Sequence, residues 1–195
     1  MEKAALTYEF TSDWFSWNIE TWKSVLERLD LRPAKVLEIG CFEGRSTVWM
    51  IEHLFGSNGG KLFCVDSWDG ASSAESAFDK NTQLSLVHRP NVSLEKLKGS
   101  SNLTLTQLVS AHYETFDLIY VDGSHDAPDV LCDLTCAFLL CRNGGLIICD
   151  DYLWNFGDDL RSTPKLAIDS FVNCYAGKLR FVNAPLYQVF LVKQA

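Results

Sequence analysis

Residues 35–50 constrain the fold of this chain more than any other stretch. They begin with a short apolar run, Val36-Leu37-Glu38-Ile39, whose length suits a buried strand of a parallel sheet. The chain then turns through Gly40-x-x-x-Gly44 into a segment that can start a helix. Glycine lets the backbone approach a ligand closely, and a helix N-terminus offers free N–H groups. This strand–turn–helix unit therefore predicts a site for a nucleotide-like ligand.

Strand-like and helix-like segments alternate along the chain. Further strands are predicted by apolar runs at 61–66, 92–98, 116–121, 146–149, 179–183 and 187–192. Helices are predicted by apolar residues at helical spacing at 19–29, 46–55, 74–87, 103–109, 126–142 and 163–175. We expect Gly144-Gly145 to end the fifth helix. The alternation implies one α/β domain over residues 1–195, with a mostly parallel seven-stranded sheet, helices on both faces and one antiparallel late strand.

The first 17 residues are rich in aromatic side chains that follow no regular period: Tyr8, Phe10, Trp14, Phe15 and Trp17. Such rings either pack on the core or form a lid over a bound ligand, and the sequence leaves both interpretations open. Residues 1–30 are thus expected to form an arm and a helix. Aromatic surface in this region also leaves a homodimer open.

Composition excludes several classes of function. The net charge of −8 and the pI near 4.9 argue against a nucleic-acid groove or an anionic membrane surface. The sequence shows neither a signal-peptide apolar region nor a run of 18 apolar residues, so we expect a soluble, cytoplasmic protein. The chain has seven cysteines, an odd number, and no C-x-x-C pair. This pattern indicates reduced, buried side chains. A metal cluster at Cys132, Cys136 and Cys141 is conceivable but has no neighbouring ligand at zinc-site spacing.

Open α/β sheets bind ligands at the carboxyl ends of their strands, where several polar residues of this chain fall. Asp66 closes the second strand, 26 positions after Gly40, and can accept hydrogen bonds from ribose hydroxyls or serve as a turn residue. Trp68 follows it and would either cover an adenine ring or pack on the core. Ser101 follows the third strand and would cap the next helix or contact the adenine edge.

Three carboxylates end the fourth and fifth strands: Asp122, Asp150 and Asp151. They would repel one another unless a cation or strong donors lie between them, and hard oxygen ligands of this kind suit Mg²⁺. His125 lies three residues after Asp122 and titrates near neutrality, so it could take a proton from a hydroxyl nucleophile. Taken singly, each residue also has an ordinary role as a helix-start acid, a solvated loop acid or a structural histidine.

The string E-x-G-x-x-x-G resembles motif I of the class I S-adenosylmethionine (SAM) dependent methyltransferases. Asp150 and Asp151 follow Asp122 by 28 and 29 positions, which resembles the ligand spacing of the cation-dependent O-methyltransferases. The strings V-D-G-S-H and D-D-Y look most like the sugar-type, macrocin O-methyltransferase-like family. The catechol type has an Asn as third ligand and a Lys as base, where this chain has Asp151 and His125.

This resemblance implies a Rossmann-like class I methyltransferase fold and metal-assisted transfer of a methyl group from SAM to a small-molecule hydroxyl. It assigns catalysis to His125 and Asp122. It assigns a divalent cation, Mg²⁺ by ligand type, to Asp122, Asp150 and Asp151. The positions that it implies for SAM are Glu38, Gly40, Cys41, Phe42, Gly44, Ser46, Thr47, Asp66, Ser67, Trp68, Ser101 and Asp122.

Two other functions remain open at this point. An NAD(P)-dependent oxidoreductase also needs a strand-end acid on a ribose, but this chain lacks the third glycine and a Tyr-x-x-x-Lys pair. A SAM-binding domain without catalysis would share every cofactor residue and lack only methyl transfer.

Overall fold

The computed structural model describes residues 7–69, 72–155, 157 and 159–195. The first six residues of the predicted arm lie outside this part of the chain. The strands are β1 Lys35–Ile39, β2 Gly60–Asp66, β3 Val92–Lys98, β4 Phe116–Val121, β5 Cys141–Cys149, β6 Leu179–Val182 and β7 Val189–Lys193. The helices are α1 Ile19–Arg28, α2 Arg45–Trp49, α3 Ser72–His88, α4 Ser101–His112, α5 Ala127–Leu140 and α6 Pro164–Cys174. A π-helical turn, Met50–Leu54, continues α2, and short 3₁₀ turns lie at Ser16–Asn18 and Leu160–Ser162.

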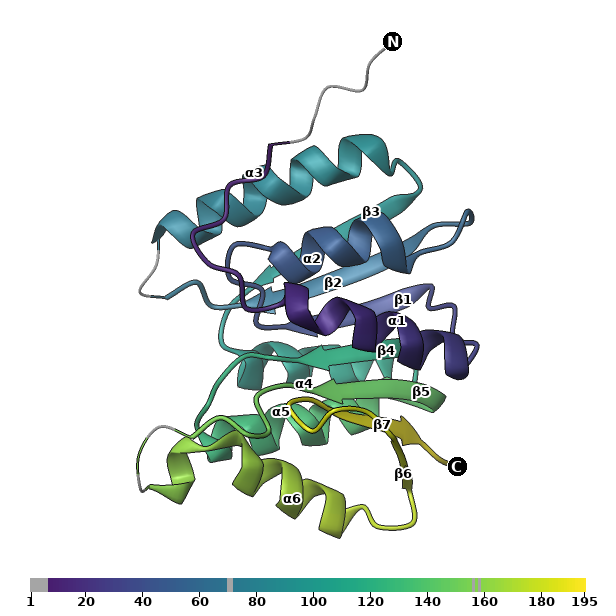
Figure 1. The fold of residues 1–195 in the computed structure, drawn as a ribbon, viewed down its shortest axis with the longest axis vertical. Helices are drawn as coiled ribbons and strands as arrows, with labels where there is room; N and C mark the ends of the chain where they lie inside the picture. The colour runs from purple at the N-terminus through teal and green to yellow at the C-terminus, as the bar shows by residue number, and fades with distance from the viewer. Residues whose placement is uncertain (1–6, 70–71, 156, 158) are drawn as a thin grey trace.

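The strands form one seven-stranded sheet in the order β3-β2-β1-β4-β5-β7-β6 (Figure 1). All adjacent pairs from β3 to β5 are parallel, whereas β7 runs antiparallel to both β5 and β6. The predicted Rossmann-like fold, with one antiparallel late strand, is therefore confirmed. Strand β1 lies between β2 and β4, so its carboxyl end is at the centre of the ligand-binding edge.

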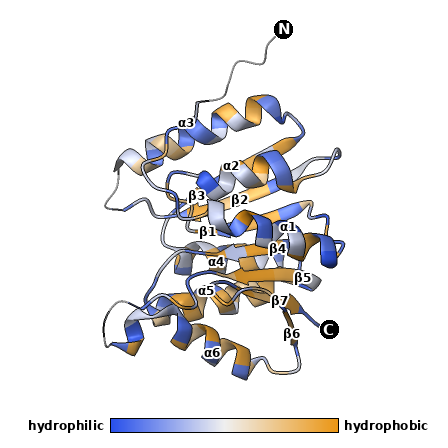
Figure 2. Cartoon of the chain, viewed as in Figure 1, coloured by the Kyte–Doolittle hydropathy of each residue, from blue (hydrophilic) through white to orange (hydrophobic). Residues whose placement is uncertain are grey.

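Helices cover both faces of the sheet, because successive side chains of a strand point to opposite sides. On β4, Leu118 and Tyr120 pack with residues of α1, α2 and α3, while Ile119 and Val121 pack with α4, α5 and α6. Figure 2 shows the strands in orange at the centre of the molecule and helices that carry both orange and blue residues. The two apolar layers hold the strand ends in fixed relative positions.

One predicted boundary is wrong. Helix α5 ends at Leu140, and β5 begins at Cys141, so Gly144 and Gly145 lie inside the strand and do not cap the helix. The strand pairing shifts register between Phe116 and Leu118, and Gly144 has a φ of +77°. Glycines fit such a bulge as well as they fit a helix C-terminus, so the Gly144-Gly145 pair wrongly predicted a helix end.

The seven cysteines are all free, and five of them are buried. No helix in the described part of the chain is long and apolar enough to cross a membrane.

Candidate functional site

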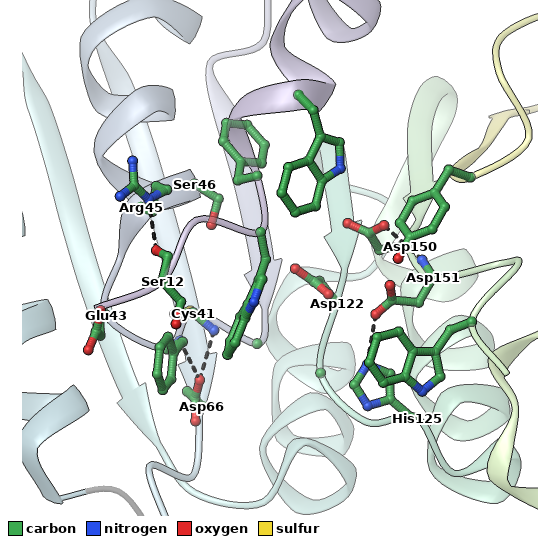
Figure 3. A pocket seen from close by; sticks show the side chains of 18 residues that line it. Ser12, Cys41, Glu43, Arg45, Ser46, Asp66, Asp122, His125, Asp150 and Asp151 are labelled. Atoms are coloured by element: carbon green, nitrogen blue, oxygen red, sulfur yellow. Dashed lines mark hydrogen bonds and ion pairs between the residues drawn. The ribbon is translucent and has the colours of Figure 1, made fainter. Parts of the chain in front are cut away.

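A cavity of about 510 Å³ lies at the carboxyl ends of the central strands, beneath the N-terminal arm (Figure 3). Its lining residues are Ser12, Trp14, Phe15, Trp17, Gly40, Cys41, Phe42, Glu43, Arg45, Ser46, Asp66, Asp122, Gly123, His125, Asp150, Asp151, Trp154 and Tyr187. The predicted residues Gly40, Cys41, Phe42, Ser46, Asp66, Asp122, His125, Asp150 and Asp151 are thus brought together in one cavity.

The glycine turn needs its first glycine for two reasons. Gly40 has a φ of +86°, a conformation that side chains disfavour, and a Cβ at this position would lie 1.9 Å from the carbonyl oxygen of Asp122. The turn after β1 therefore touches the backbone after β4, which joins the two halves of the site. Gly44, with a φ of +82°, directly precedes α2.

Asp66 organises this turn. Its Oδ2 accepts hydrogen bonds from the backbone N–H groups of Cys41 and Phe42 at 2.8 and 2.9 Å, and its Oδ1 accepts one from Trp68 at 2.7 Å. Figure 3 shows Asp66 beside Cys41 at one end of the cavity. Because each carboxylate oxygen has two lone pairs, Asp66 retains acceptor capacity toward the cavity.

Glu38 lies behind the turn and does not line the cavity. It is fully buried and accepts hydrogen bonds from the hydroxyl of Ser46 and from that of Thr47, the latter at 2.5 Å. Burial raises the pKa of Glu38 to about 7, although the hydroxyl bonds act in the opposite direction. Glu38 therefore links β1 to the first turn of α2.

Five other predicted cofactor residues also lie outside the cavity lining: Gly44, Thr47, Ser67, Trp68 and Ser101. Trp68 is 6% exposed, packs against Phe78 at 4.9 Å between ring centroids and donates its indole N–H to the carbonyl of Phe42 at 2.8 Å. It supports the glycine turn from behind. Ser101 is the first residue of α4, one position after its N-cap, Ser100.

The other end of the cavity is acidic. The hydroxyl of Tyr120 donates to Oδ2 of Asp150 and lies 2.9 Å from Oδ2 of Asp122. Burial, followed by the charges of Asp150 and Asp151, raises the pKa of Asp122 well above its usual range. Burial also raises the pKa of Asp150 to about 6. Negative charge at this end is therefore costly, and a cation or a shared proton would relieve it.

His125 pairs with Asp151, with 2.8 Å between Nε2 and Oδ2 (Figure 3). The hydrogen bond that the imidazole donates to Asp151 raises the pKa of His125, while burial acts against it. The indole of Trp154 stacks on the imidazole with 4.7 Å between ring centroids and 13° between planes. Asp151 itself has a φ of +56°, a strained conformation for a residue with a side chain, as is frequent at functional sites.

The three aspartates fit a hard divalent cation in donor chemistry and in location. In the described part of the chain, however, the only set of three possible ligand atoms all within 4.8 Å of one another belongs to Glu38, Cys41 and Cys64. That set is fully buried, and burial raises the pKa of both thiols, which disfavours metal binding there. To share a cation, the carboxylate oxygens of Asp122, Asp150 and Asp151 would have to draw closer together.

The arm is anchored to the glycine turn. The backbone N–H and hydroxyl of Thr11 donate to Glu43 at 2.6 and 2.7 Å, and the Nε of Arg45 donates to the carbonyl of Ser12 at 3.1 Å. Trp14 stacks on Phe42 at 5.1 Å between centroids. Figure 1 shows the arm, in purple, passing α3 and α2 before it enters α1. The arm thus both packs on the domain and borders the cavity.

Sequence reasoning assigned no role to several residues of the site: Arg45, Tyr120, Trp154, Tyr187 and Gln188. Tyr120 could have been found, because strand periodicity places it on the same side as Asp122 two positions later. Gln188 is a polar residue inside an apolar final strand region, and such a residue, when buried, needs a specific partner. Arg45, Trp154 and Tyr187 carry no such signal in the sequence.

Comparison with known proteins identifies relatives of this chain. A family model described as "Methyltransferase domain" matches residues 37–152. The uncharacterized protein R132 of Acanthamoeba polyphaga mimivirus is 28% identical over 163 residues, which are 82% of this chain and 68% of that protein.

Two solved structures share the fold at low sequence identity. The O-methyltransferase from Bacillus cereus, in complex with SAH, has a TM-score of 0.69 at 19% identity, covering 94% of this chain and 84% of that chain. The MycE methyltransferase from the mycinamycin biosynthetic pathway, in complex with Mg and SAH, has a TM-score of 0.64 at 19% identity. That match covers 94% of this chain and 51% of MycE.

Proposed function

This chain belongs to the methyltransferase-domain family that its residues 37–152 match, and we propose that it transfers a methyl group from SAM to a hydroxyl oxygen of a small molecule. The observation that carries the proposal is the composition of the cavity at the strand ends. It joins the glycine turn and Asp66 at one end to the His125–Asp151 pair at the other. A cofactor end and a proton-accepting end within about 510 Å³ are what direct methyl transfer requires.

At the cofactor end, SAM would lie against the turn from Gly40 to Phe42. The close backbone approach at Gly40 leaves room for the ligand, and Asp66 offers acceptor capacity to ribose hydroxyls. The arm residues Trp14 and Ser12 cover this end and would exclude water from the reacting sulfonium.

At the other end, His125 would take the proton from the acceptor hydroxyl. Asp151 and Trp154 hold the imidazole in one orientation, and a neutral ring bonded to Asp151 through Nε2 carries its basic lone pair on Nδ1. The resulting oxyanion would attack the methyl carbon in line with the departing sulfur. Positioning and exclusion of water would supply most of the rate.

We further propose that Asp122, Asp150 and Asp151 hold a divalent cation, Mg²⁺ being the candidate by ligand type. The raised pKa of Asp122, caused by burial and by its two acidic neighbours, supports this assignment, since a cation would offset that repulsion. MycE, solved with Mg, and the Bacillus cereus O-methyltransferase share this fold, which supports both the cation and transfer to oxygen. A bound cation would lower the pKa of the acceptor hydroxyl.

Calorimetric titration of SAM into the purified protein, with Mg²⁺ and then with EDTA, tests the proposal. We expect binding in both conditions, because the glycine turn and Asp66 are separate from the acidic end. Absence of binding in both would reject the methyltransferase proposal. Binding without methyl transfer to any hydroxylated acceptor in a broad screen would instead favour a SAM-binding domain without catalysis.

The variant Asp151→Ala tests the cation assignment. It should bind SAM like the wild type and lose the EDTA-sensitive part of methyl transfer, measured with radiolabelled SAM. Asp126→Ala is the matched control, because Asp126 is an exposed acid next to His125 and does not line the cavity. Normal EDTA-sensitive turnover in Asp151→Ala would reject the assignment.

A further inference from the structure

A buried chain of hydrogen bonds reaches the acidic end of the cavity from the N-terminal helix. The indole Nε1 of Trp22 in α1 donates to Oε1 of Gln188 at 2.8 Å, and Nε2 of Gln188 donates to Oδ2 of Asp150 at 2.7 Å. Trp22 is 0% exposed and Gln188 is 3% exposed, so water does not compete for these bonds. Both residues lie outside the span 37–152 that the family model matches.

The indole decides which end of the Gln188 amide faces Asp150. An indole N–H can only donate, so the amide must turn its oxygen toward Trp22. Its NH₂ group then faces Asp150 and needs an acceptor, which a carboxylate oxygen supplies. Trp22 therefore acts on Asp150 through Gln188.

Tyr120 completes the enclosure of the carboxylate. Its hydroxyl donates to the same Oδ2 of Asp150, while the backbone N–H of Asp151 donates to Oδ1 at 2.7 Å. Trp22 packs edge-on against the Tyr120 ring, with 4.9 Å between centroids and 88° between planes. Trp22 thus contacts both side chains that bind Oδ2, and the carboxylate is held by donors on both of its oxygens.

We propose that Gln188 and Trp22 are positioning residues that orient the carboxylate of Asp150 for binding a divalent cation. The inference rests on the proposed function, because it takes Asp150 as a cation ligand. Removal of a group that hydrogen-bonds to a metal-ligating side chain commonly weakens metal binding by roughly 10- to 100-fold. This positioning role would make α1 and the region before β7 part of the proposed cation site.

The test uses Mn²⁺ as the probe, with the full-length protein saturated with SAM, and follows free Mn²⁺ by electron paramagnetic resonance. Gln188→Leu should weaken Mn²⁺ binding by at least about tenfold and leave the affinity for SAM unchanged. Trp22→Phe keeps an aromatic ring but removes the N–H donor, and should weaken binding less. The control Gln83→Leu, at an exposed position of α3, should bind Mn²⁺ like the wild type.

The double variant Trp22→Phe/Gln188→Leu separates positioning from general packing. If Trp22 acts through Gln188, the double variant should bind Mn²⁺ no more weakly than Gln188→Leu alone. Additive losses would overturn that coupling. A Gln188→Leu protein that folds poorly would also lose SAM binding. In that case the Mn²⁺ affinity of Trp22→Phe, compared with that of the wild type, decides whether the hydrogen-bond chain positions Asp150.

The outcomes distinguish this inference from the function on which it rests. Wild-type Mn²⁺ affinity in Gln188→Leu would overturn the positioning role and leave the methyltransferase proposal intact. Absence of Mn²⁺ binding by the wild type would overturn the cation assignment and the positioning role together. SAM binding, measured in the same samples, still judges the methyltransferase proposal independently.

Discussion

Single residues in this protein owe their roles to where the sheet places them. Gly40 is needed because its missing side chain leaves space for the carbonyl of Asp122, which lies 82 positions later in the chain. Glu38 is tolerated in the core because two hydroxyls of α2 donate to it. Both residues connect the glycine turn to its surroundings, so their substitution should change stability before it changes chemistry.

Replacement of Gly40 by alanine should destabilise the fold by at least about 2 kcal/mol, since it combines a disfavoured φ with overlap against backbone atoms. Urea unfolding measures the loss. Gly56→Ala is the matched control, because a Cβ there meets nothing within 4 Å. Equal stability of the two variants would contradict the close approach.

Glu38 should make stability depend on pH. Burial raises its pKa to about 7 in the folded state, from 4.5 in a model compound, so the folded protein holds this proton more tightly than the unfolded chain. Its contribution is fully present below pH 4.5 and is lost as pH rises toward 7. The wild type should therefore lose about 3 kcal/mol more unfolding free energy than Glu38→Gln across that interval.

Urea unfolding of both proteins at several pH values checks this expectation. Asp150 and Asp133, whose pKa values burial raises to about 6, titrate in the same window in both proteins. The titration of Glu38 is therefore measured by the difference between the two proteins in the slope of unfolding free energy against pH. Parallel slopes would mean that Glu38 stays ionised in the folded state.

At the scale of elements, the N-terminal arm is held by the glycine turn that it covers. Thr11 is bound by Glu43, which is 4% exposed, and Arg45 forms an ion pair with Asp13 at 3.3 Å. The guanidinium of Arg45 also lies over the ring of Phe10 at 4.3 Å. Because these contacts come from the residues that border the cofactor end, release of the arm and release of the cofactor should be coupled.

Glu43→Gln tests this coupling, because an amide keeps the shape of the side chain but offers one acceptor oxygen where Thr11 presents two donors. Backbone hydrogen exchange of residues 7–18 should become roughly tenfold faster, since a bond to a charged group is worth about 1.5–3 kcal/mol. SAM should also dissociate faster in stopped-flow measurements. Glu20→Gln, on the exposed face of α1, is the control.

The two readouts separate a lid from simple packing. Faster exchange of the arm together with faster SAM dissociation would support a lid. Faster exchange with unchanged dissociation would mean that the arm only packs on the domain.

At the scale of the whole molecule, charge should select the acceptor. The net charge is −8, and the cavity is lined by Glu43, Asp66, Asp122, Asp150 and Asp151. Arg45, also in the lining, is engaged by the arm. Even with a divalent cation bound, the acidic end would keep an excess of negative charge. The field of the cavity should therefore repel anionic acceptors.

Three ortho-diphenols that share one ring but differ in substituent charge can measure this selection: catechol, dopamine and 3,4-dihydroxybenzoate. We expect kcat/KM for the cationic compound to exceed that for the anionic one by at least about tenfold, because like charges disfavour approach. The gap should narrow at about 0.5 M NaCl, where screening is strong. Faster methylation of the anionic compound would contradict this prediction.

The sequence alone determined the features that depend on neighbouring residues. Apolar runs and their spacing predicted the order of strands and helices, one antiparallel late strand and the strand-end positions of Asp66, Asp122 and Asp150. These follow from local periodicity and from the rule that parallel strands end at one edge. The boundary at Gly144 was misjudged because glycine suits a helix end and a strand bulge equally well.

Only the tertiary structure decided which of those residues meet. The pairing of His125 with Asp151, the support of the glycine turn by Trp68 and the bonds from Trp22 through Gln188 to Asp150 join residues far apart in the chain. Trp22 and Gln188 are 166 positions apart, and no local pattern reports such a contact. Strand order and the packing of α1 on the sheet bring them together, because a buried polar group must find its partner wherever the fold places one.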